Sequence, residues 1–283
     1  MKSRENAQHK GNFMSRKFKP LEELTIQDNF MFVKVFSNPD TAKPFLEAVL
    51  KIKIQKISVV GEYHLDANPQ KKRVRFDIFA KEYIGDEVGR TCDIEMQVVD
   101  THELPLRARY YQSICDVETL GTSHQYKELK EQYVIFLCPK DIFGKGRPIY
   151  EFENIEKNDH SILLRDLTYK IFFIFSKYEA FTDEAVREYM EYFATSKVAS
   201  QTAKNLQNQV DFFRRDMKTR SDYMDLEYLL SEERQEGRAE GRFEERTEIA
   251  KEMLLEGDLV ERVVRLTKLS ESEVLEIQRN LAL

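Results

Sequence analysis

The chain has 283 residues, of which 41% are hydrophobic and 11% aromatic, enough to bury the core of one large domain or of two ordinary ones. Its net charge of −6 argues against a protein that coats nucleic acid by bulk electrostatic attraction, although a local basic surface is compatible with it. Dense apolar runs such as residues 171–175 are far too short to cross a bilayer, and the charged N-terminus lacks the apolar segment of an export signal. We therefore expect a soluble, cytoplasmic protein without a membrane partner.

The N-terminal part of the chain predicts a basic tail, two helices and a strand. Residues 1–20 are rich in basic side chains and predict a flexible tail. Asp28 begins the first helix, and Asn38-Pro39-Asp40 separates it from a second helix over residues 41–50. Residues 56–63 are rich in β-branched side chains and predict a strand.

Residues 75–97 predict a β-hairpin that carries acids on one face, because apolar and polar residues alternate along both arms. If residues 85–87 form the turn, Asp77 lies opposite Glu95 with Cβ atoms about 5 Å apart, and Gln97 shares their face. Two facing carboxylates repel each other unless a positive charge lies between them. A divalent metal ion would supply that charge.

The residues after the hairpin predict a helix from residue 104 to 120 that Gly121 ends, with a proline in its first turn. The unbroken apolar run 133–138 predicts a buried strand reached by a crossover from the hairpin, and residues 149–152 and 169–176 predict edge strands. This order of elements indicates an α/β fold with a mixed sheet. Cys92, Cys115 and Cys138 are widely spaced among apolar residues and predict core positions, not disulfides or a thiolate metal site.

The chain from Thr182 onward predicts helices. Residues 235–246 hold a four-residue repeat containing Glu-Gly-Arg, which we interpret as an exposed helix laced with Glu/Arg pairs. Two short helices follow, and Ser270 and Glu273 have the spacing of a capping box. This final pair is similar to the turn and second helix of helix-turn-helix modules, so a role in reading DNA and a role in docking or self-association both stay open.

Four motifs in order carry a resemblance to a known family: D-N-F-M-F-V-K-V-F at 28–36, R-F-D at 75–77, D-I-E-M-Q at 93–97 and R-A-R-Y-Y at 107–111. With them the chain resembles the PD-(D/E)XK nuclease superfamily and, within it, the Rpn family of recombination-promoting nucleases and putative transposases. The resemblance implies a restriction-endonuclease-like core over residues 21–180. We expect a helical region with the Glu-Gly-Arg repeat over 181–256 and a terminal helical pair over 257–283.

The resemblance also implies a DNA endonuclease that depends on Mg²⁺ or Mn²⁺ and has little sequence specificity. By the family pattern, Asp77 and Glu95 are metal ligands, and the backbone carbonyl of Met96 is a third. Asp28 either adds another acid or only stabilises the dipole of its helix.

Gln97 departs from the superfamily pattern, because a neutral amide cannot supply the positive charge of the usual lysine, although it can orient water. Arg107 is our candidate for the missing cation. An ordinary salt bridge from Arg107 to Glu95 or Asp93 is the alternative, and the sequence leaves both open.

The expected DNA partner would meet basic and aromatic residues near the hairpin: Lys71, Lys72, Arg73, Arg75, Arg109, Tyr110 and Tyr111. The basic residues could equally form a solvated surface, and at least one of the two tyrosines is expected in the core. A second function is a catalytically inactive DNA- or partner-binding protein that keeps the nuclease fold. The C-terminal helices are also expected to support a homo-oligomer.

Overall fold

The computed structural model describes residues 18–65, 74–99, 102–120 and 123–281. The predicted tail therefore lies almost wholly outside the described residues, as do Lys71, Lys72, Arg73 and Gly121. The chain divides into two compact units, the first ending at Thr219 and the second beginning at Arg220. The helices are α1 (Asn29–Phe36), α2 (Pro39–Leu50), α3 (Leu104–Thr119), α4 (Glu184–Thr195), α5 (Gln201–Arg215), α6 (Met217–Leu255), α7 (Val260–Thr267) and α8 (Glu271–Leu281).

The first unit is built on a mixed six-stranded sheet of order β1-β2-β3-β4-β6-β5. Neighbours are antiparallel except that β4 runs parallel to both β3 and β6, which confirms the α/β class, the hairpin and the crossover. The prediction that the last strand lies at an edge was wrong: β6 lies between β4 and β5, and its residues 171–174 are buried. The strands are β1 (Lys56–Leu65), β2 (Val74–Ile84), β3 (Glu87–Met96), β4 (Glu131–Cys138), β5 (Ile149–Phe152) and β6 (Thr168–Ile174).

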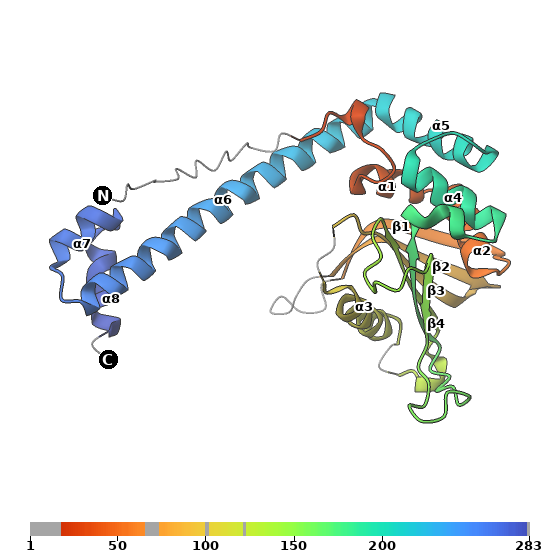
Figure 1. Cartoon of the computed structure of the whole chain (residues 1–283), viewed down its shortest axis with the longest axis horizontal. Coiled ribbons are helices and arrows are strands. Elements are labelled where there is room, and N and C mark those ends of the chain that lie inside the picture. Colours follow the sequence, from red (N-terminus) through yellow and green to blue (C-terminus); the bar gives the residue numbers. More distant parts are fainter. Residues whose placement is uncertain (1–17, 66–73, 100–101, 121–122, 282–283) are drawn as a thin grey trace, which may run out of the picture. The chain divides into compact units, whose positions relative to one another are not determined.

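Helices cover both faces of this sheet (Figure 1). On one face, Ala108 and Tyr111 of α3 pack with Phe136 and Phe172 of the central strands. On the other face, α1, α2 and α4 meet in a cluster of aromatic rings such as Phe36, Phe45 and Phe193. The acids of the hairpin therefore lie beneath α3 instead of on an exposed face. The three cysteines are buried free thiols, as predicted.

Helices α4 and α5 belong to the first unit, whereas the sequence placed a domain boundary at residue 180. Val186, Tyr189, Met190 and Phe193 recur at helical spacing on α4 and are all buried. Helix α4 packs against α2, and α5 packs against α1. These helices therefore contribute to the core of the first unit.

The second unit contains most of α6 together with α7 and α8. Ala250, Val263, Leu269 and Val274 form its buried cluster. The predicted capping box is present, because the Ser270 backbone N–H donates to the Glu273 carboxylate at 2.6 Å and the Glu273 N–H donates to Ser270 Oγ at 3.3 Å. Residues 232–246 of α6 are exposed, as the repeat predicted. Among the described residues, no helix is both long enough and apolar enough to span a membrane.

Candidate active site

The hairpin turn is tighter than the sequence suggested. Strand β2 ends at Ile84, which pairs with Glu87, so only Gly85 and Asp86 lie between the strands, and Gly85 adopts a φ of +64°. Extending that register without interruption would set Asp77 opposite Ile94. The predicted pairing with Glu95 therefore needs one extra residue in β3.

Gly89 is that extra residue. Tyr83 pairs with Val88 and Glu82 pairs with Arg90, so Gly89 between them forms a β-bulge. The shifted ladder continues to the pair Ile78 and Ile94. One residue further, Asp77 lies across from Glu95, as predicted. A shorter turn and the bulge together produce this register.

Beyond Ile78 and Ile94 the side chains of the two acids take the place of ladder hydrogen bonds. The Asp77 backbone N–H donates to Glu95 Oε1 at 3.0 Å, and the Met96 backbone N–H donates to Asp77 Oδ2 at 3.1 Å. Asp77 is 6% exposed and Glu95 is 2% exposed. Each carboxylate is therefore held across the two strands by a backbone donor.

Asp93 adds a third buried carboxyl group that the sequence analysis did not place in the site. It is 2% exposed, and because side chains alternate along a strand it lies on the same face as Glu95. No described N–H or O–H group donates to either of its oxygens, and its carboxyl contacts that of Glu95. The period-two spacing of Asp93 and Glu95 was the signal that could have identified it.

The three carboxyl groups share a shortage of positive charge. Burial, followed by the charge of Asp77, raises the pKa of Glu95 to about 8. Burial, together with the charges of Glu95 and Asp77, raises the pKa of Asp93 well above its ordinary value. The pKa of Asp77 is also raised, mainly by burial, although Arg75 and Arg107 act against this shift. A cation at this position would offset the repulsion.

Arg107 of α3 reaches the site. Its Nη2 donates to Glu95 Oε2 at 2.8 Å and to the Tyr111 hydroxyl at 2.9 Å, and its Nη1 donates to Gln97 Oε1 at 2.6 Å. The Gln97 amide in turn donates to the Val99 carbonyl oxygen. The guanidinium is thus both a salt-bridge partner of Glu95 and a cation in direct contact with Gln97, which stands at the position of the missing lysine.

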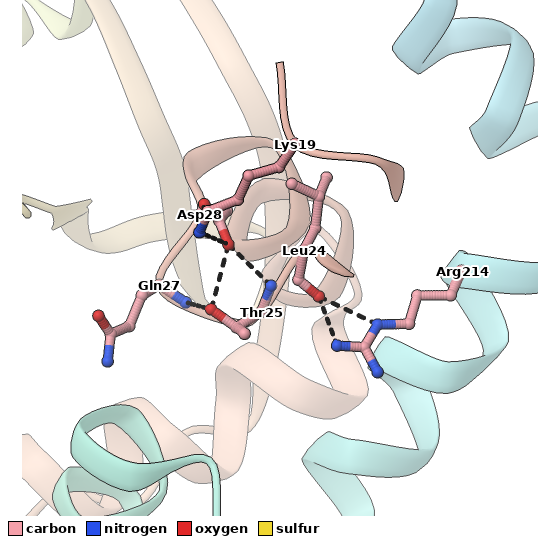
Figure 2. Close-up of polar contacts among 6 residues, drawn as sticks. All are labelled: Lys19, Leu24, Thr25, Gln27, Asp28 and Arg214. Carbon is pink, nitrogen blue, oxygen red and sulfur yellow. Dashed lines mark hydrogen bonds and ion pairs between the residues drawn. The ribbon is translucent and has the colours of Figure 1, made fainter. Parts of the chain in front are cut away.

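Helix α1 contributes Asn29 to the site and not Asp28. The Asn29 side chain donates a hydrogen bond to the Asp77 carboxylate. Asp28 is instead held by Lys19 Nζ at 2.8 Å and by the Thr25 backbone N–H at 2.8 Å (Figure 2). We therefore leave Asp28 out of the metal site proposed below.

The residues expected to touch DNA do not form one described surface. Arg75 is exposed, and its Nη1 lies 3.8 Å from Glu62 Oε1. Arg109 is also exposed and lines a separate cleft of about 550 Å³ beside α3. Tyr110 is half-buried against the core. The Tyr111 ring is buried edge-on to Phe76, with centroids 5.0 Å apart, so it does not fit a base-stacking role.

The donors at the site suit a hard divalent cation. Asp77 and Glu95 offer carboxylate oxygens, which Mg²⁺ and Mn²⁺ prefer. Within the described ranges, no group of three or more acidic, histidine or cysteine side chains is arranged to hold a metal ion. Two carboxylates, with backbone oxygens and water, match the habit of Mg²⁺ of keeping several waters.

Comparison with known proteins agrees with this geometry. A family model described as PD-(D/E)XK nuclease family transposase matches residues 26–235, which include α1, the whole sheet and α3. No curated protein and no solved structure shows significant similarity to the chain. The match covers most of the chain, including Asp77, Glu95 and Arg107. The protein therefore belongs to the PD-(D/E)XK nuclease family transposases.

Proposed function

We propose that the protein is a Mg²⁺- or Mn²⁺-dependent DNA endonuclease of the cytoplasm that hydrolyses phosphodiester bonds with little sequence specificity. Membership of a nuclease family supports the reaction class. The observation that carries the proposal is the group of three buried carboxyls where β2 and β3 part, with the Arg107 guanidinium beside them. This arrangement is costly for the fold unless a cation joins it.

Asp77 and Glu95 would hold the metal ion, with the Met96 carbonyl as a further oxygen ligand. A bound divalent cation lowers the pKa of an attacking water and neutralises charge on the scissile phosphate. Arg107 is fixed by Gln97 and Tyr111 as well as by Glu95, so its guanidinium stays at the site and can contact an anionic phosphate. Gln97 keeps that guanidinium oriented.

Plasmid cleavage tests the proposal. Purified protein should nick supercoiled plasmid with Mg²⁺ or Mn²⁺ and not with EDTA. Asp77→Asn and Glu95→Gln should each abolish nicking, while Glu82→Gln, a buried acid at the other end of the hairpin, should retain it. Nicking that both site substitutions leave unchanged would remove the assignment.

A non-catalytic DNA- or partner-binding protein is the second candidate. Gln97 favours it, because a neutral amide bonded to Arg107 and Val99 stands where the superfamily pattern has lysine. This candidate predicts that millimolar Mg²⁺ does not bind, while DNA binds with a steep salt dependence. Metal binding at the acids together with metal-dependent nicking contradicts it.

We further propose that the Glu-Gly-Arg repeat of α6 pairs in parallel with the same helix of a second copy. An added Cβ at Gly237 or Gly241 would meet no atom within 4 Å, so neither glycine is needed for packing inside the chain. At about 100° per residue, Glu236 and Arg238 flank Gly237 on opposite sides. Two parallel helices that meet along the glycines set Glu against Arg on both flanks, whereas antiparallel helices set like charges together.

Light scattering after charge reversal tests this pairing. The wild-type chain should be a dimer, and changing Arg234, Arg238 and Arg242 together to Glu should give monomers. Adding Glu236→Arg, Glu240→Arg and Glu244→Arg to that variant should restore the dimer. A monomeric wild type, or a dimer that survives the first reversal, contradicts the parallel pairing.

A further inference from the structure

The residue that opens α1 touches the site from outside the sheet. Asn29 is half-buried, and its side chain donates a hydrogen bond to the Asp77 carboxylate. A second donor to this carboxylate is the Met96 backbone N–H of β3, at 3.1 Å from Oδ2. Asp77 is therefore oriented by two elements that are far apart in the sequence.

The backbone that leads to Asn29 is anchored by two helices of the same unit. Arg214 of α5 donates to the Leu24 carbonyl oxygen from Nε at 3.0 Å and from Nη2 at 2.7 Å (Figure 2). The Gln27 side chain donates to the Phe193 carbonyl oxygen of α4 at 2.6 Å. These contacts fix residues 24–28 immediately before Asn29.

Local contacts close the same segment. The Thr25 hydroxyl and backbone N–H both donate to Asp28 Oδ2, at 3.1 and 2.8 Å. Asp28 thus shapes the entry into α1, so that the next residue projects toward Asp77. Asp28, the first residue of the motif at 28–36, organises the segment, and its neighbour Asn29 contacts Asp77.

We infer that Asn29 is a positioning residue for Asp77, held in place by the contact of Arg214 with Leu24; this inference rests on the proposed metal site. An Asp77 carboxylate that loses its amide donor can rotate away from the ligand orientation. Losing an outer partner of a metal ligand typically lowers metal affinity about 10–100-fold. Removing Arg214 affects Asp77 only through the segment that holds Asn29, so it should lower the metal affinity less.

Mn²⁺ titration followed by electron paramagnetic resonance of free Mn²⁺ tests the inference on the full-length chain. Asn29→Leu keeps the side-chain size and removes the donor. Its Mn²⁺ affinity should fall about 10–100-fold, and saturating Mn²⁺ should restore most of its plasmid nicking. Its thermal unfolding in EDTA should match that of the wild type, which separates positioning from loss of fold.

Arg214→Met should weaken Mn²⁺ binding less than Asn29→Leu. Arg215→Met is its matched control, because Arg215 is exposed and donates only within α5, to the Asp211 carbonyl oxygen among its described contacts. If the wild type binds Mn²⁺ and Asn29→Leu binds it with the same affinity, the positioning role of Asn29 is overturned while the proposed function stands. Equal affinities for Arg214→Met and Arg215→Met overturn the anchoring role. A wild type that binds no Mn²⁺ overturns the proposed function and this inference with it.

Discussion

The acidic side chains at the two ends of strands β2, β3 and β4 are paired with positive charge to different extents. At the hairpin end, the Arg90 guanidinium donates to the carboxylates of both Glu82 and Glu131. The Tyr133 hydroxyl also donates to Glu131, at 2.8 Å. One cation and its hydrogen bonds join three neighbouring strands there.

At the other end, three buried carboxyls share the Arg107 guanidinium, and the pKa of each is raised. The same strands that bind their acids firmly at one end leave them short of positive charge at the other. An arrangement that costs stability persists where it serves function. The comparison therefore supports the proposal that the Asp77 end is the chemical end and the Arg90 end is structural.

Removing one carboxylate at the chemical end should have the largest effect. Glu95→Gln keeps the shape and removes a metal ligand, so the single-turnover rate of plasmid nicking should fall about 1,000-fold, or roughly 4 kcal/mol. Glu82→Gln at the structural end should nick at a rate close to that of the wild type per folded molecule. Equal losses in the two variants would break the comparison.

Arg107→Met should lower nicking at saturating Mg²⁺ about 100-fold, because the guanidinium that contacts Glu95 is lost. Its Mn²⁺ affinity should not fall, since removing a positive neighbour favours cation binding at Glu95. Arg109→Met on the same helix should behave like the wild type. A variant of Arg107 that fails only in metal binding would argue for a purely structural role.

The metal-free protein should lose stability as pH rises from about 5 to about 8. The pKa of Glu95 is raised from 4.5 to about 8 in the folded chain, so over this range the folded state binds more protons than the unfolded state. Unfolding in urea with EDTA measures the trend, and Glu95→Gln should flatten it. A wild-type stability that rises over this interval by the same amount as in Glu95→Gln contradicts the assigned pKa.

The smallest effect on chemistry is expected at Arg90. Arg90→Met leaves the buried carboxylate of Glu82 without its guanidinium donor and should lower the free energy of unfolding by about 1–3 kcal/mol. Nicking per folded molecule should not change. A large loss of nicking would show that the two ends of the strands are coupled.

Local patterns predicted most of the first unit, because strand alternation, proline positions and capping residues act over a few neighbours. The pairing of Asp77 with Glu95 was predicted through a three-residue turn, yet it arises from a two-residue turn and the bulge at Gly89. Counting residues along a hairpin cannot separate these two cases, since both give the same register at the acids. Glycine inside a strand was the available signal for a bulge.

The sequence also indicated Asp77, Glu95 and Arg107, but not the roles of Asp93 and Asn29. The Asp93 carboxyl is buried at the site because helices cover both faces of the sheet. In a hairpin considered alone, its side chain would be solvated. Asn29 acts across the distance between α1 and β2, which only tertiary packing brings together. The same packing buries the Tyr111 ring that an isolated helix would expose.

Crystals soaked in Mn²⁺ and measured at an anomalous wavelength test the central claim most directly. The account predicts one strong anomalous peak about 2.1 Å from carboxylate oxygens of both Asp77 and Glu95. The peak should disappear in Glu95→Gln crystals. A soaked wild-type crystal without density between these two acids, or with its peak elsewhere, would contradict the assignment of this site.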